Sequence, residues 1–180
     1  MAKASVYISV DVEADGPIPG PYSMISLGAC VAGRHDGDVF TPVDPEVQTF
    51  YRELRPISDQ FVPEALAVSG LDRDLLVKSG AEPAAAMRDF AAWVKEVSGP
   101  AAAVFTAYPA SFDWMFTYWY VMRFTGSSPF GHSPVPGHED VFRRSGRASD
   151  QRGGQGDHAQ ALALESEAHA QRAGRRDRAR

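Results

Sequence analysis

Two carboxylates, Asp11 and Glu13, stand two residues apart near the end of an alternating apolar stretch that begins at Val6. Valine and isoleucine alternate there with polar residues, a pattern that predicts a β-strand with one aliphatic face. Because successive side chains of a strand point to opposite faces, Asp11 and Glu13 would share the other face. Two neighbouring anions repel unless a cation lies between them, and hard oxygen ligands suit Mg²⁺ and Mn²⁺. The pair indicates a divalent-metal site, although the solvated edge of an ordinary strand would also explain it.

A third candidate, Asp113, falls in the first turn of a helix that is expected to begin near Ser111. A carboxylate at that place also offsets the positive end of the helix, so Asp113 alone does not identify a site. A short apolar run, residues 101–106, precedes the helix and predicts a buried strand. The helix itself is expected to pack through one apolar face, formed by Phe112, Met115, Phe116, Trp119 and Met122.

The rest of the body would supply the elements that position these carboxylates. Strands are expected over residues 24–32, 39–41 and 48–54, joined by short turns as an antiparallel meander, and helices over 63–68 and 83–98. The Gly- and Pro-rich segment 15–21 reads as a loop. Strands followed by helices that alternate with one further strand predict an α/β fold, a mixed sheet with helices packed on it.

Composition narrows the class of protein. The chain has 180 residues and is 44% hydrophobic, which suits one α/β domain. It has no apolar run of membrane-spanning length, no signal-like N-terminal segment and a single cysteine, Cys30, so we expect a cytoplasmic protein without disulfides. Residues 1–142 hold nine basic and 18 acidic side chains, whereas residues 143–180 hold nine and five. Residues 1–142 are therefore acidic overall, and the tail formed by residues 143–180 is basic overall.

Two strings carry a resemblance to a known family. Asp-Val-Glu ends the first expected strand, and Ala-Tyr-Pro-Ala-Ser-Phe-Asp-Trp-Met-Phe spans residues 107–116. Together they resemble the DEDD superfamily of 3′→5′ exonucleases, which includes polymerase proofreading subunits, ribonuclease T and oligoribonuclease. Its first motif is D-x-E on the first strand, and its second ends in Phe/Tyr-Asp at a helix start. The resemblance covers about residues 4–132, with Val-Ser-Gly-Leu at 68–71 as a weaker match, and implies a ribonuclease H-like fold.

The resemblance implies a role for each matching residue. Asp11, Glu13 and Asp113 would be catalytic and would ligate two Mg²⁺ or Mn²⁺ ions, which activate water and stabilise the leaving 3′-oxygen. Asp15 and Gly16 would lie beside the terminal nucleotide. Phe112 would stack on a base or ribose, although a core position suits it equally well. The expected partners are 3′ ends of single-stranded DNA or RNA, and a homodimer is one expected assembly.

The chain departs from the family after the second motif. The superfamily needs a fourth carboxylate and a general base before it, spaced H-x4-D or Y-x3-D. Neither spacing occurs after Asp113. Residues 143–180 contain no Val, Ile, Phe, Tyr or Trp, which is typical of a disordered basic tail or of DNA read in the wrong frame. A one-base offset, with codons chosen freely, permits L-D-M-K-T-Y for residues 136–142 and a later H-K-G-L-D-D.

Three hypotheses about function remain. We expect residues 1–142 to form an incomplete exonuclease domain, inactive or crippled as written, with a frameshift beginning between about His132 and Pro136. The alternative is a non-catalytic module derived from the same fold, which would bind nucleic acid or a protein without cleaving it. A phosphatase with Asp11 as nucleophile is weaker, because such enzymes usually carry a second aspartate two residues on, where this chain has Glu13.

Overall fold

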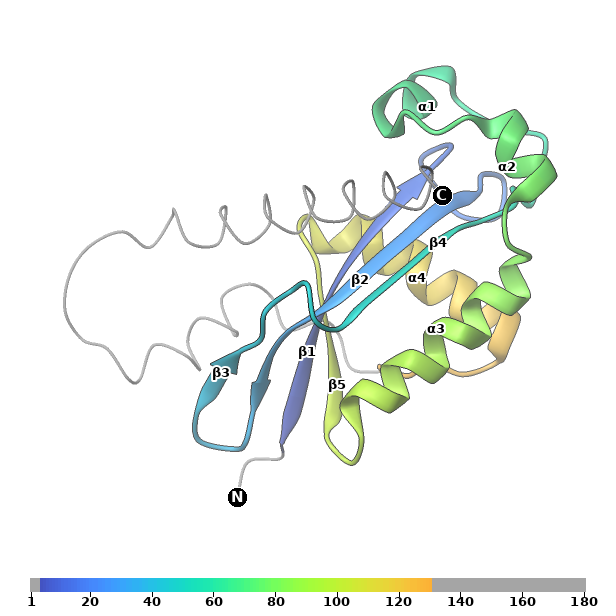
Figure 1. The fold of residues 1–180 in the computed structure, drawn as a ribbon. Helices are drawn as coiled ribbons and strands as arrows, with labels where there is room; N and C mark the ends of the chain where they lie inside the picture. The colour runs from blue at the N-terminus through green and yellow to red at the C-terminus, as the bar shows by residue number, and fades with distance from the viewer. Residues whose placement is uncertain (1–3, 131–180) are drawn as a thin grey trace, which may run out of the picture.

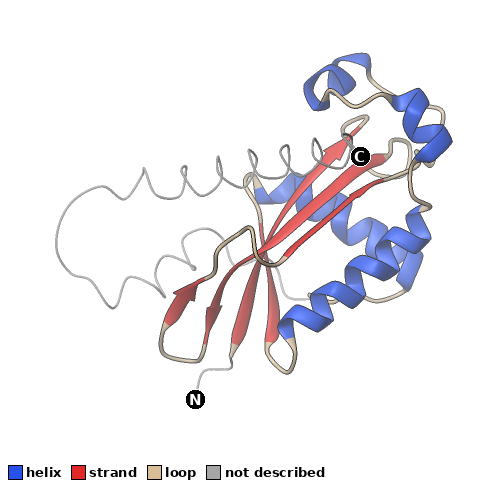
Figure 2. Ribbon diagram, viewed as in Figure 1, coloured by secondary structure: helices blue, strands red, loops and turns tan. Residues whose placement is uncertain are grey.

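The computed structural model describes residues 4–130, and their five strands form one mixed sheet (Figures 1 and 2). The strands are β1 (Ser5–Ala14), β2 (Met24–His35), β3 (Phe40–Pro42), β4 (Thr49–Glu53) and β5 (Ala102–Thr106). The order is β3-β2-β1-β5, and β4 also pairs with β2. The α/β class is confirmed, and the predicted antiparallel meander is confirmed only in part, because β3 and β4 each pair antiparallel with β2 and not with each other.

β1 lies inside the sheet, between an antiparallel and a parallel neighbour. Asp11 faces Gly28 of β2 in the register and Glu13 faces Ser26, but the pairing shifts between Glu13 and Ala14, which faces Met24. On the other side, β1 pairs in parallel with β5, which within residues 4–130 has no second neighbour. β5 is therefore mostly half-buried, not fully buried as its apolar sequence predicts.

Within residues 4–130, four helices accompany the sheet. They are α1 (Pro63–Ser69), α2 (Arg73–Ser79), α3 (Pro83–Ser98) and α4 (Ala110–Thr125). α3 and α4 contact each other and β1, while α1 and α2 lie near the end of β1 and the start of β2 (Figure 1). No helix in the described part of the chain is long and apolar enough to cross a membrane.

The helix expected over residues 83–98 is confirmed as α3, and the predicted apolar face of α4 is confirmed in part. The buried residues of α3 include Met87, Phe90, Val94 and Val97. On α4 the fully buried residues are Asp113, Phe116, Thr117, Tyr120 and Val121. Of the predicted face, Phe116 is fully buried, and Phe112, Met115 and Trp119 are partly buried against the core. α4 is rich in large apolar residues on every side, so periodicity alone does not show which side meets the sheet. The observed orientation buries the side that carries Asp113.

The aromatic core extends to the end of the described residues. Phe130 is buried, and the centroid of its ring lies 5.3 Å from that of Phe105 on β5 and 6.1 Å from that of Phe90 on α3. Packing of this kind stabilises a domain through buried area and ring geometry. The predicted boundary at residues 142/143, the basic tail and the fourth carboxylate all lie outside the described residues and stay predictions.

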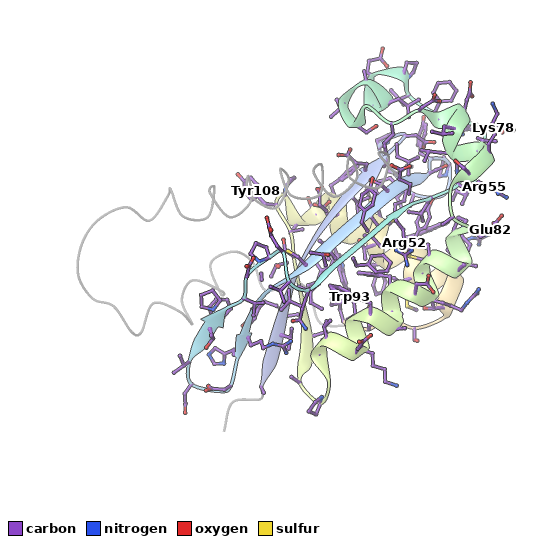
Figure 3. All side chains as sticks on the ribbon, viewed as in Figure 1. Arg52, Arg55, Lys78, Glu82, Trp93 and Tyr108 are labelled. Atoms are coloured by element: carbon purple, nitrogen blue, oxygen red, sulfur yellow. The ribbon has the colours of Figure 1, made fainter. Side chains whose placement is uncertain are left out.

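Gly80 fixes the junction between α2 and the strand edge. A Cβ atom built on Gly80 would lie 2.5–2.7 Å from backbone atoms of Leu76, Leu54 and Arg55. Adjacent backbone bonds, from Arg55 N to Ala81 O and from Ala81 N to Glu53 O, hold the two segments together. Arg55 and Glu82 also form an exposed ion pair at this junction (Figure 3), which contributes little by itself.

We expect Gly80→Ala to lower the free energy of unfolding by about 2–3 kcal/mol, because backbone atoms must move to admit the methyl group. Gly70→Ala is the matched control. Gly70 has a φ of +65° with nothing within 4 Å of the added Cβ, so only the left-handed conformation opposes it, at about 1 kcal/mol. Urea denaturation of both variants measures the difference. Equal effects would contradict the close approach at Gly80.

Candidate active site

The end of β1 and the start of α4 meet through one buried hydrogen bond. The backbone N–H of Val12 donates to Oδ1 of Asp113 at 2.9 Å, which joins positions 101 residues apart in the chain. Asp113 is 4% exposed, although its side chain belongs to the first turn of a helix. Val12 lies between Asp11 and Glu13, so the structure places Asp113 beside the part of β1 that carries the other two candidate carboxylates.

The pKa of Asp113 reflects its burial and its acidic neighbours. Its pKa is raised from 3.8 to about 7, first by burial and then by the negative charge of Asp11. The Val12 N–H lowers the pKa, and the charge of Glu13 adds a smaller increase. Two neighbouring carboxylates and a low dielectric oppose ionisation of Asp113. This corner of the fold therefore favours either a proton on Asp113 or a cation beside it.

The three carboxylates are chemically suited to a hard divalent cation, but they do not form a complete set of metal ligands in the described residues. Asp11, Glu13 and Asp113 offer only carboxylate oxygens, the ligands that Mg²⁺ and Mn²⁺ prefer. Across residues 4–130, no group of three or more His, Cys, Asp and Glu side chains is arranged to hold a metal ion. The raised pKa of Asp113 marks the charge that a bound cation would neutralise. The chemistry of the donors fits, and their role as ligands stays a proposal.

Asp15 is fully buried, and both of its carboxylate oxygens contact protein groups. Oδ1 accepts the N–H of Ser23 at 2.5 Å, and Oδ2 lies 3.2 Å from Nε of Arg73. At Gly16, a Cβ atom would lie 2.2 Å from the ring of Tyr22. Both residues therefore fix the loop between β1 and β2. The expected contact of Asp15 and Gly16 with a terminal nucleotide stays a prediction.

Phe112 and Cys30 are the remaining residues that the sequence singles out. The ring centroid of Phe112 lies 5.0 Å from that of Phe116, and Phe112 is half-buried against the core, so its core reading is supported. Its stacking on a nucleotide stays a prediction. Cys30 is buried, and burial raises its pKa to about 11, as expected for a core thiol and not for a nucleophile.

Sequence reasoning missed three polar residues and one aromatic residue around the site. Arg73, Ser23 and Tyr120 join Asp15 in a buried network, and no short motif links them because they are far apart in sequence. The N-cap Asp72, which accepts from the backbone N–H groups of residues 74 and 75, was the available signal for the missed helix α2. Tyr108 is 61% exposed just before α4 (Figure 3).

No protein-family model matches the chain. Over 127 residues it is 42% identical to a protein of Escherichia coli described as "3'-5' DNA exonuclease Cap18". That match covers 70% of this chain and 62% of the relative, so the chain spans less than two thirds of the relative's length.

Solved structures show the same fold. The metal-free Escherichia coli exonuclease I complex with single-stranded DNA and the complex of that enzyme with a dT13 oligonucleotide each match with a TM-score of 0.51 and 20% identity. Each match covers 70% of this chain and 25% of the other. The sequence match and the shared fold support the resemblance predicted from the two motifs, which is to 3′→5′ exonucleases of the DEDD, ribonuclease H-like type.

Proposed function

We propose that residues 4–130 carry three of the metal-binding carboxylates of a 3′→5′ exonuclease that acts on the ends of single-stranded DNA. The observation that carries the proposal is the buried Asp113, which accepts the Val12 N–H while Asp11 and Glu13 raise its pKa. A fold with no use for a cation at this place would gain nothing from burying one carboxyl beside two others.

Each residue has a distinct part in this proposal. Asp11 and Glu13 come from the part of β1 that pairs with β2, because β5 pairs with β1 only as far as Ser9. Asp113 is buried and oriented by the Val12 N–H, which keeps one carboxylate oxygen directed towards β1. When bound, a pair of divalent ions supplies an activated water and stabilises the leaving 3′-oxygen. The same positive charge would let the acidic site accept the phosphate of a nucleotide.

We propose DNA, and not RNA, as the substrate of this site. The sequence relative is described as a DNA exonuclease, and the matched structures contain single-stranded DNA. An exposed aromatic just before α4, Tyr108, and the half-buried Phe112 are candidates for stacking on a terminal base. A homodimer remains one expected assembly.

We expect the chain to bind Mn²⁺ and to lose at least tenfold in affinity in Asp11→Ala and in Asp113→Asn, because each variant removes a charged ligand. Asp38→Asn is the matched control, since Asp38 is an exposed carboxylate in the turn between β2 and β3. Titration followed by electron paramagnetic resonance counts the bound ions and measures their dissociation constants. Equal affinity in all four proteins would mean that Mn²⁺ binds elsewhere.

A non-cleaving binding module is the second candidate. One observation favours it, namely that neither general-base spacing follows Asp113. That module would bind a short single-stranded oligonucleotide more tightly in the presence of Mg²⁺ and release no nucleotide from its 3′ end. An end-labelled oligonucleotide distinguishes the two, because binding and release of 3′-terminal mononucleotides are read from the same sample.

A further inference from the structure

The candidate carboxylates belong to two elements whose relative position regular pairing does not fix. The β1–β2 register shifts between Glu13 and Ala14, so the ladder becomes irregular right beside Glu13. Asp113 stands on α4, which is held to the sheet by side-chain packing and by individual hydrogen bonds. Metal binding tolerates only small errors in ligand position. Something else must therefore set how Glu13 and Asp113 lie relative to each other.

After the register shift, Asp15 forms hydrogen bonds that join the end of β1 to the residue before β2. The N–H of Asp15 donates to Ser23 O at 2.9 Å, and its Oδ1 accepts the Ser23 N–H at 2.5 Å. The carbonyl of Asp15 also accepts the Val62 N–H at 2.8 Å. Asp15 thus fixes the backbone two residues after Glu13 to the start of β2 and to the start of α1.

Arg73 of α2 makes the burial of Asp15 tolerable. Its Nε lies 3.2 Å from Oδ2 of a carboxylate that is fully buried, and its guanidinium also donates to Ser58 O. The same guanidinium lies 4.9 Å from the ring centroid of Phe61. A buried carboxylate without such a partner is costly. Arg73 therefore ties α2 to the end of β1 that carries Glu13.

Tyr120 connects this arrangement to α4. Its hydroxyl oxygen accepts the Met24 N–H at 2.7 Å and hydrogen-bonds with the side chain of Ser23, whose Oγ also accepts the Ile57 N–H at 3.0 Å. Seven residues, about two helical turns, separate Asp113 from Tyr120, so both lie on one side of α4. α4 is thus attached to the β1–β2 pair at two points along its length, by Asp113 and by Tyr120.

We propose that Tyr120 is a positioning residue, whose hydroxyl, through Ser23 and the Asp15–Arg73 pair, sets the placement of Asp113 relative to Glu13 and so the affinity of the site for divalent metal. Four side chains, from the loop between β1 and β2, from α2 and from α4, form the Arg73–Asp15–Ser23–Tyr120 network. The inference rests on the proposed metal site. A residue with a merely structural role would change the stability of the fold and leave the metal affinity of the folded molecules unchanged.

The test compares Tyr120→Phe with Tyr118→Phe in the full chain. Both variants remove one hydroxyl from α4, but Tyr118 packs at 5.0 Å against Trp114 and lies outside the network. Mn²⁺ dissociation constants are measured by electron paramagnetic resonance, and urea denaturation gives the fraction folded in the same buffer. We expect Tyr120→Phe to weaken Mn²⁺ binding about tenfold per folded molecule, the range of outer-shell substitutions at metal sites, and Tyr118→Phe to change it less than twofold.

Arg73→Lys keeps the measurement informative if Tyr120→Phe fails to fold. Lysine retains the charge beside Asp15 but cannot contact Asp15 and Ser58 with one planar group, so affinity should fall in the same direction. If Tyr120→Phe and Arg73→Lys fold and bind Mn²⁺ as tightly as the unmodified chain, the positioning role of Tyr120 is wrong, but the proposed metal site still stands. Absence of Mn²⁺ binding by the unmodified chain overturns the proposed metal site and this inference with it.

Discussion

Asp113→Asn is expected to stabilise the metal-free chain at pH 8 by about 2–4 kcal/mol, although it removes a proposed catalytic residue. The buried carboxyl of Asp113 has its pKa raised from 3.8 to about 7, by burial first and by Asp11 next. Above pH 7 the folded chain must therefore keep a third carboxylate ionised in an unfavourable place. Asparagine carries no charge, and its Oδ1 can still accept the Val12 N–H.

The sign of the pH dependence follows from proton counts. In the unfolded chain Asp113 loses its proton near pH 3.8, and in the folded chain it does so near pH 7. Between these values the folded state binds more protons, so the free energy of unfolding decreases as pH rises. The stability gap between Asp113→Asn and the unmodified chain should be near zero at pH 4 and reach its full size above pH 7.

Urea denaturation in EDTA at pH 4.5 and pH 8 measures this gap, with Asp38→Asn as a control for loss of an exposed carboxylate. Addition of Mg²⁺ at pH 8 should stabilise the unmodified chain and leave Asp113→Asn nearly unchanged, because only the former gains a ligand for the ion. A variant that is equally destabilised at both pH values would contradict the raised pKa of Asp113.

The two halves of the site could be predicted because each is local. Alternation over a few residues places Asp11 and Glu13 on one face of β1. The residues before α4 predict a helix start whose first turn contains Asp113. That the two halves meet follows from the parallel pairing of β1 with β5, which leads directly into α4. The family resemblance supplied that pairing, and periodicity alone did not.

The network behind the site could not be predicted because its contacts join distant residues. The sequence places Asp15 in a loop, and nothing local shows that its carboxylate contacts Arg73, 58 residues away. In the sequence, Tyr120 is one of several aromatic residues on α4, and no motif distinguishes it. Its role depends on reaching Met24, 96 residues earlier in the chain.

The largest change in activity is expected from the reading frame after about His132. As written, the chain should release almost no 3′-terminal nucleotides, because no fourth carboxylate with its general base follows Asp113 at the family's spacing. The sequence relative matches 127 residues of the 180, so a large part of the chain remains unmatched. A gene read one base later from there, with L-D-M-K and H-K-G-L-D-D restored, should gain at least the 10²–10⁴-fold, roughly, that general-base catalysis contributes.

The assay uses a 5′-labelled single-stranded oligonucleotide with Mg²⁺ or Mn²⁺, in parallel with an RNA of the same sequence. Activity of the restored protein should disappear again in Asp11→Ala and in Asp113→Asn, and should persist in Asp38→Asn, whose carboxylate lies in the turn beyond β2. The nucleotide sequence across codons 130–140 shows independently whether a base is missing. If the restored protein folds, binds metal and releases nothing from DNA or RNA, the exonuclease proposal is wrong. The binding module then becomes the better explanation, because three carboxylates can hold a cation and a phosphate without activating water.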